Sequence, residues 1–177
     1  YAEKGDTFVG WKLRNETVVF SPDNSRWHVR SSRIENAAGF TSDKPWRAQN
    51  IIKAYNKLIA FDNQDGRIGD LSRSFYDEYG NNISREFDVS PIRTGKVFLL
   101  PRLEVEIQAG VGDATTPDPQ IQMAKSKNGS EFSAYRNRSM GGVGKYNQRA
   151  VWRQLGRFTD YALLRFRTTE KVQVAIL

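Results

Sequence analysis

The chain has 177 residues, which is long enough for one domain with its own core or for part of a larger modular fold. It contains no cysteine, which excludes disulfides, thiolate metal sites and a cysteine nucleophile. Lysine and arginine outnumber aspartate and glutamate by 27 to 20, so the formal charge of +7 permits contact with nucleic acid or another acidic surface. No apolar run reaches the length of a membrane span and no signal segment is visible, so we expect no contact with a membrane.

The N-terminal residues alternate in polarity as a half-buried sheet requires. Val9, Trp11 and Leu13 occupy alternate positions, and clusters of turn-forming residues separate this run from the two that follow. We expect an antiparallel meander with strands at residues 7–14, 17–21 and 26–30. Residues 33–45 end in SerAspLysPro and are predicted to form a loop.

Residues 46–89 are predicted to form hairpins. The expected strands are residues 46–55, 58–62 and 67–71, with AsnGlnAspGly as a tight turn before the third. Ile51, Ala54 and Leu58 also have helical spacing, so a helix over residues 46–58 is the alternative. We favour a strand because the neighbouring segments are hairpins. TyrGlyAsnAsn lies between short aromatic and β-branched runs and predicts one more hairpin over residues 75–89.

The clearest strand pattern covers residues 97–109. Leu103, Val105 and Ile107 point to one face, and the polar residues between them point to the other. Pro101 near the start predicts an edge strand or a bulge. We expect an exposed, mobile loop at residues 110–120. A hairpin then follows, with strands at residues 121–126 and 131–136 and a glycine-rich connector at residues 140–145.

The last segment, residues 146–177, carries three apolar lines with a period of two. They are Tyr146, Ala150 and Trp152; Ala162, Leu164 and Phe166; and Val172, Val174 and Ile176. With Leu155 and Gly156 as a bend, the segment is predicted to form three successive antiparallel strands. Three strands cannot cover their own apolar face, so we expect them to pack on the sheets coded earlier.

The predicted fold class is therefore all-β, either β-propeller-like or a multi-sheet antiparallel meander. Short strands with turn signals every few residues are typical of sandwiches, barrels and propellers. No part of the chain alternates strands with long helices. The core candidates are Trp27, Trp152 and Phe166.

Residues with catalytic or metal-binding potential are few. His28 is the only histidine, and a lone histidine without cysteine does not build a transition-metal site, so we interpret it as structural. Asp62, Asp65 and Asp70 lack the spacing of an EF-hand and fit turns better than a calcium site. Glu104 and Glu106 share a strand face at a spacing that glycoside hydrolysis can use, but the regular alternation favours a solvated surface. We therefore predict no catalytic residue, no metal site and no cofactor.

Arginines form the main candidate interaction site. If Ala162, Leu164 and Phe166 point inward, Arg165 and Arg167 point outward. By the same alternation, Arg149 and Arg153 point away from Trp152. These arginines would lie on one side of two adjacent strands, where they could bind phosphates or pair with acidic residues of a partner subunit. We favour the subunit. The full set of interface candidates is Arg149, Arg153, Arg157, Arg165 and Arg167.

The order of these features resembles the packaged-DNA stabilisation proteins of short-tailed bacteriophages, which form the tail hub. The resemblance is carried by residues 17–32, 56–68, 103–112 and 146–157, followed by LeuArgPheArg and the terminal strand. It covers nearly the whole chain but only the C-terminal part of that family. SerLysAsnGlySer stands where relatives have a Ser-Asp-Gly-Gly hairpin.

This resemblance implies that residues 1–177 are the C-terminal portion of a single β-propeller-like hub domain with no enzymatic activity. It also implies a sixfold ring that closes the portal channel, bound to the portal adaptor above and to a tail needle or other distal tail proteins below. The location would be the virion tail, assembled in the cytoplasm of the host bacterium. Contact with the packaged DNA end stays open.

Two other classes of function also stay open. A sialidase-like or glycan-binding propeller is suggested by residues 126–132, which resemble an Asp-box hairpin with asparagine in place of aspartate, and by the abundant aromatic residues. A nucleic-acid-binding β domain is suggested by the arginine candidates.

Overall fold

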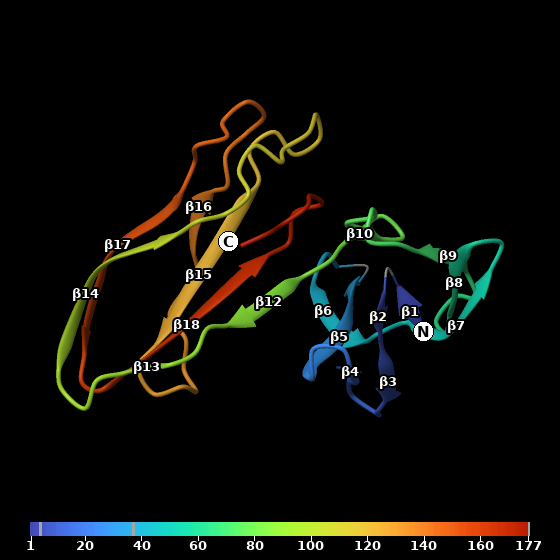
Figure 1. Cartoon of the computed structure of the whole chain (residues 1–177), viewed down its shortest axis with the longest axis horizontal. Coiled ribbons are helices and arrows are strands. Elements are labelled where there is room, and N and C mark those ends of the chain that lie inside the picture. The colour runs from blue at the N-terminus through green and yellow to red at the C-terminus, as the bar shows by residue number, and fades with distance from the viewer. Residues whose placement is uncertain (4, 37, 177) are drawn as a thin grey trace. The chain divides into compact units, whose positions relative to one another are not determined.

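The computed structural model describes residues 1–3, 5–36 and 38–176 (Figure 1). All regular elements of the described residues are β-strands, which confirms the all-β prediction. The chain divides into two compact units, Tyr1–Ile83 and Ser84–Leu177, and each is described by itself. A single propeller-like domain across the whole chain stays a prediction.

The N-terminal unit begins with a meander. After the short pair β1 (Ala2–Glu3) and β2 (Asp6–Thr7), four strands follow in the order β3-β4-β5-β6. They are β3 (Val9–Lys12), β4 (Thr17–Ser21), β5 (Arg26–Glu35) and β6 (Thr41–Pro45). The meander was predicted, but the loop at residues 33–45 was wrong. Thr41–Pro45 pairs with the end of β5 and is exposed over most of its length, so its sequence carries no buried alternation that would indicate a strand.

A second sheet of the N-terminal unit has the order β7-β8-β9. It consists of β7 (Ala48–Ala54), β8 (Lys57–Asp62) and β9 (Ile68–Leu71), so the strand interpretation is confirmed against the helix. Tyr55 and Asn56 both have positive φ, as a two-residue hairpin turn of type I′ requires.

The hairpin predicted at residues 75–89 is only partly present. β10 (Asp77–Glu78) and β11 (Asn81–Asn82) pair around Tyr79 and Gly80. The next strand, β12 (Arg85–Asp88), pairs instead with a strand of the C-terminal unit that lies about eighty residues later in the chain. A turn sequence predicts a local reversal, but it does not show how far the paired strands extend.

The interior of the N-terminal unit is mostly polar. Among the described residues of this unit, the buried hydrophobic side chains are Val19 and Ala60, whereas ten large hydrophobic side chains are exposed. Its buried polar residues are Thr17, Ser21, Ser32, Arg47 and Asp62. This unit therefore has very little apolar core of its own.

The C-terminal unit is a two-layer antiparallel sandwich (Figure 1). One layer pairs β14 (Phe98–Val105) with β17 (Ala150–Phe158). The other has the order β12-β18-β15-β16, with β13 (Ile92–Arg93) also paired to β18. Its strands are β15 (Gln120–Ser126), β16 (Arg136–Ser139) and β18 (Tyr161–Thr168).

The core of the sandwich lies between these layers and includes eleven buried hydrophobic side chains of the unit. Trp152 of β17 is fully buried and meets Phe166 of β18 edge to face, with ring centroids 5.6 Å apart. Phe98 and Phe158 stack at 5.3 Å within the first layer, and Phe87 stacks on Phe166 at 5.4 Å within the second. Aromatic contacts of this kind contribute beyond the burial of their area.

The prediction of three successive paired strands at the C-terminus was wrong. β17 and β18 belong to different layers and do not pair with each other. The supposed bend at Leu155 and Gly156 lies inside β17, where positive φ values at Gln154 and Gly156 distort the strand without ending it. The terminal segment forms only an isolated bridge between Ile107 and Ile176. Alternation shows which side chains are buried, but it does not identify the neighbouring strand.

The remaining predictions for this unit are largely confirmed. The pairing of β14 with β17 shifts register between Leu100 and Arg102, which is the irregularity expected at Pro101. The hairpin arm after β15 begins only at Arg136, later than predicted, with an isolated bridge between Ser126 and Phe132 before it. The segment before β15 is a loop, but it is packed, because a Cβ on Gly142 would lie 2.6 Å from the carbonyl oxygen of Pro117.

The difference between the two units predicts different behaviour in isolation. A polypeptide of residues 84–177 should unfold cooperatively in urea, because the sandwich core lies within it. Trp152 is the one tryptophan of this segment, so its fluorescence reports directly on that core. A polypeptide of residues 1–83 should show no cooperative transition. Cooperative unfolding of residues 1–83 together with a broad transition for residues 84–177 would contradict this account.

Candidate interaction surfaces

The predicted arginine candidates lie on two different surfaces. Arg153 and Arg157 belong to β17, and Arg165 and Arg167 belong to β18. Since the apolar side chains of both strands point into the sandwich, the two arginine pairs lie on the opposite outer faces of its two layers. The expectation of one continuous arginine face on adjacent strands was therefore wrong. The error arose from the assumption that β17 and β18 pair with each other.

Arg165 is bound by acidic neighbours from β12. Its Nε and Nη2 atoms donate to the two carboxylate oxygens of Asp88 at 2.7 and 2.9 Å, and Glu86 lies 3.4 Å away. The bonds to Asp88 raise the pKa of Arg165. The guanidinium also stacks on the ring of Phe132, 3.9 Å from its centroid.

Arg167 has a similar set of contacts. Its Nε donates to the side-chain oxygen of Gln122 at 2.8 Å, and its guanidinium lies 3.8 Å from the ring centroid of Tyr135. The hydroxyl of Tyr135 donates to Glu86 at 2.6 Å, and burial together with this bond raises the pKa of Tyr135 to about 12. We call Arg165, Arg167, Phe132 and Tyr135 the stacked arginine face. Both of its arginines are engaged within the unit rather than free to bind phosphates.

Sequence reasoning missed the partners of this face. Glu86 and Asp88 become neighbours of Arg165 only because β12 pairs with β18. Phe132 and Tyr135 come from the segment between β15 and β16, which was predicted to be a strand. Phe132 and Tyr135 are three positions apart, so strand alternation would place them on opposite faces, and no signal in the sequence indicated that both contact arginines of β18.

The outer surface of the other layer is more open. Arg149 donates to Glu104 at 2.8 Å, Arg102 also pairs with Glu104, and the bond from Arg149 lowers the pKa of that carboxyl group. Glu104 is thus an ionised partner of arginines, which supports the solvated-surface interpretation over a glycosidase pair. Arg153 and Arg157 are exposed, and their side chains form no ion pair with any residue that the structure describes.

One edge of β17 is covered by arginines that the sequence analysis did not identify. Arg138 donates to the carbonyl oxygen of Val151 at 2.6 Å, and Arg136 donates to that of Arg153 at 2.9 Å. In return, the indole of Trp152 donates to the carbonyl oxygen of Arg136 at 2.8 Å. These bonds join the two layers along one side and occupy backbone groups that would otherwise be open to another strand.

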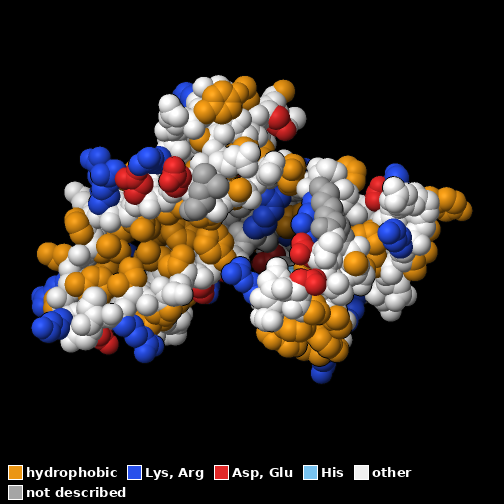
Figure 2. Space-filling model, in the orientation of Figure 1, with side chains coloured by type: hydrophobic (Ala, Val, Ile, Leu, Met, Phe, Trp, Pro, Cys, Tyr) orange, Lys and Arg blue, Asp and Glu red, His pale blue; other side chains and the backbone are white. Residues whose placement is uncertain are grey.

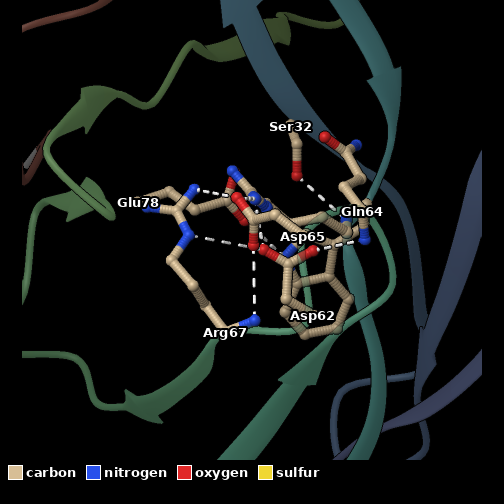
Figure 3. Close-up of polar contacts among 8 residues, drawn as sticks. Ser32, Asp62, Gln64, Asp65, Arg67 and Glu78 are labelled. Atoms are coloured by element: carbon tan, nitrogen blue, oxygen red, sulfur yellow. Dashed lines mark hydrogen bonds and ion pairs between the residues drawn. The ribbon is translucent and has the colours of Figure 1, made fainter.

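In the N-terminal unit, an ionic cluster replaces the calcium site that the aspartates could have suggested (Figure 3). Arg47 pairs with the buried Asp62 and also with Asp65, and Arg67 binds Asp65 at 2.7 Å. The bond from Arg67 lowers the pKa of Asp65, and both arginines stack on Tyr79. Asp70 pairs separately with Lys57 at 3.0 Å. In this cluster, the guanidinium groups of Arg47 and Arg67 supply the positive charge that a calcium ion would otherwise bring to the aspartates.

No group of three or more histidine, cysteine, aspartate or glutamate residues that could hold a metal occurs in the described part of the chain. Glu78 accepts a hydrogen bond from the indole of Trp46 at 3.1 Å, and burial raises its pKa. These contacts fit a structural role in holding the hairpin of Glu78 to the unit.

His28 and the hairpin after β15 also have structural contacts. Arg30 donates from Nε to Nε2 of His28 at 3.2 Å, and burial followed by the charge of Arg30 lowers the pKa of His28. In the hairpin, Ser126 accepts from the backbone of Gly129, and Asn128 accepts from the backbone of Glu131, both at 2.9 Å. Asn128 thus fills the turn role that aspartate has in an Asp-box, with no sugar-binding role required.

The core candidates differ in their surroundings. Trp152 and Phe166 lie in the sandwich core. Trp27, predicted as core, is 63% exposed; it stacks on Trp11 at 5.5 Å and lies tilted against Phe20 at 4.7 Å. The alternation around Trp27 correctly indicates an apolar sheet face, but no described residue of the N-terminal unit covers that face.

The C-terminal unit is thus an antiparallel β-sandwich with paired charges on its outer faces. Domains of this class serve as structural and interaction modules. Residues 92–177 match the family model described as bacteriophage P22 Gp10, beta-sandwich. This part of the chain is similar to the sandwich domain of that family, and Gp10 is the DNA-stabilisation and tail hub protein of phage P22; the similarity covers that segment alone. The resemblance predicted from the sequence is confirmed. No curated protein matches the chain. No helix of the described residues is long and apolar enough to cross a membrane.

The lowered pKa of His28 predicts a pH dependence of the N-terminal unit. Because its folded-state pKa lies below the unfolded value near 6.5, the folded chain takes up this proton less readily than the unfolded chain. The stability linked to His28 is complete above the unfolded pKa and is lost as the pH falls through the folded pKa. An NMR titration of this single imidazole in the assembled chain, where the unit is folded, measures the value directly, and His28→Gln should remove its share of the pH dependence. A pKa at or above 6.5 would contradict the prediction.

The two arginine surfaces predict different costs of substitution. Arg165→Ala should destabilise the sandwich by about 1–3 kcal/mol, since it leaves Asp88 and Glu86 without their cation and removes packing on Phe132. Arg153→Ala is the matched control and should change the unfolding free energy by less than about 0.5 kcal/mol, because its side chain is exposed. Urea denaturation of both variants tests this, and equal costs would show that the contacts of Arg165 contribute nothing to stability.

Proposed function

We propose that the chain is a structural component of a bacteriophage tail hub, which closes the portal channel after DNA packaging and links the portal adaptor to distal tail proteins such as a tail needle. The observation that carries this proposal is the match of residues 92–177 to the Gp10 β-sandwich. Similarity to this family implies a location in the virion tail and a structural rather than enzymatic role. Assembly in the cytoplasm of the host bacterium follows from the same role.

We further propose that the chain works as a homo-oligomer, a sixfold ring bound to the adaptor. The N-terminal unit supports this, since it exposes ten large hydrophobic side chains and buries very few among the described residues. A surface of this kind is stable in a permanent assembly, where neighbouring subunits remove it from water. A propeller-like arrangement of the complete hub belongs to the same proposal.

The arginine surfaces take distinct roles within this proposal. Arg153 and Arg157, with Arg149 beside them, form an exposed cationic surface that would pair with acidic residues of a neighbouring subunit. Arg165 and Arg167 form a second, rigid surface, because their guanidinium groups are already held by neighbours. We favour subunit contact over contact with the DNA end, because Arg165 and Arg167 are already held within the unit and leave fewer open cations for phosphates.

Native mass spectrometry with the portal adaptor ring of the same phage tests the tail-hub role. The expected result is a complex with six copies of the chain on the adaptor. Arg153→Glu should weaken this complex, whereas Lys53→Glu, an exposed cation of the N-terminal unit, serves as a control with the same change of charge. A chain that ignores the adaptor would overturn the proposal. A chain that instead binds DNA, with affinity falling steeply as salt rises, would support the nucleic-acid alternative.

A further inference from the structure

One face of the β3-β4-β5 sheet is apolar throughout. In the antiparallel register, Val9 lies opposite Phe20 and Trp11 lies opposite Val18, and these pairs continue across the sheet to β5. Residues directly opposite each other project from the same face. We call the resulting surface the aromatic face, and its members are Val9, Trp11, Leu13, Val18, Phe20, Trp27 and Val29.

The aromatic face is exposed although its side chains are large. Trp11 is 46% exposed, Trp27 is 63% exposed and Val29 is 58% exposed. Figure 2 shows hydrophobic side chains gathered over β4 and β5 of this unit. The other face of the same sheet carries the fully buried Val19. The more apolar of the two faces is therefore the one in contact with water.

The size of this surface matches the centre of a stable protein interface. Taking about 200 Å² for a whole aromatic side chain, the exposed fractions amount to roughly 400–500 Å² of apolar area. This equals the largest apolar patch of a typical monomer. A standard interface buries about 800 Å² on each partner, so the aromatic face with a polar border would supply one side.

The chemistry of the face also limits its partner. It contains no charged side chain, so it offers nothing to select nucleic acid or an acidic ligand. Permanent interfaces between identical subunits are more apolar than transient ones. Trp27 already packs against both Trp11 and Phe20, so little side-chain freedom remains to be lost on docking.

We infer that the aromatic face is a permanent interface with a second copy of this chain. The inference rests on the oligomeric ring of the proposed function and assigns one of its contact surfaces. Trp27 is the central residue, because it contacts both Trp11 and Phe20 and is the more exposed of the two tryptophans. In a cyclic ring, this face meets a different surface of the neighbouring copy.

Analytical ultracentrifugation of the whole chain tests the interface. The wild type should form a discrete oligomer as its concentration rises, and Trp27→Glu should raise the dissociation constant about 100-fold or more, as expected for a tryptophan at the centre of an interface. Tyr55→Glu is the matched control, because Tyr55 is a 93% exposed aromatic residue in the β7–β8 turn, outside the aromatic face. It should assemble like the wild type.

Hydroxyl-radical footprinting of the unaltered chain supplies a second measurement that needs no variant. Oxidation of Trp27 should fall as the oligomer forms. The inference is overturned if Trp27→Glu assembles like the wild type, if Trp27 is protected already in the dilute monomer, or if only a different tail protein protects it. Failure of the tail-hub role is a separate result, since it would appear as loss of adaptor binding by a chain that still self-associates through Trp27.

Discussion

Trp152 is the residue on which the architecture of the C-terminal unit depends. Its indole lies fully buried between the two layers, meets Phe166 of the opposite layer at 5.6 Å and donates a hydrogen bond to the backbone of Arg136. One side chain thus joins β17, β18 and β16. Removing a buried tryptophan from such a position costs about 3–5 kcal/mol, which is a large part of the stability of a small domain. The outer arginines keep their positions because this core holds the strands beneath them.

Among its described residues, the N-terminal unit has no fully buried aromatic residue equivalent to Trp152. Its most buried charged contact is the pair of Arg47 and Asp62, and a buried ion pair is weak evidence of stability, since desolvation offsets much of the attraction. The pair fixes the hairpin geometry around Asp65 and Tyr79 instead. A unit with a polar interior and an apolar exterior depends on contacts beyond itself. This property fits a virion component, which functions only within an assembly.

The sequence predicted side-chain direction and most local hairpins well, but it did not predict the partners of β12 and β17. Alternation correctly turned Ala162, Leu164 and Phe166 inward, and it correctly turned Arg165 outward. It could not show that β17 and β18 lie in separate layers, because a strand has the same period whichever strand lies beside it.

The prediction of interaction surfaces from the sequence was limited in the same way. An apolar pattern at Trp27 predicts a face that avoids water, but it does not tell whether that face is covered by the same chain or by another. The family resemblance could be found from the sequence alone, because it depends on the order of many weak motifs rather than on any contact between residues.

Hydrogen–deuterium exchange of the complete chain, free and assembled into the tail, tests the central claim that one unit is autonomous and the other is completed by its neighbours. Amides of β15, β17 and β18 should be protected in both states, whereas those of β3, β4 and β5 should become protected only on assembly. Equal protection of β3–β5 in the free monomer would contradict the account, because it would show that the N-terminal unit is stable without a partner.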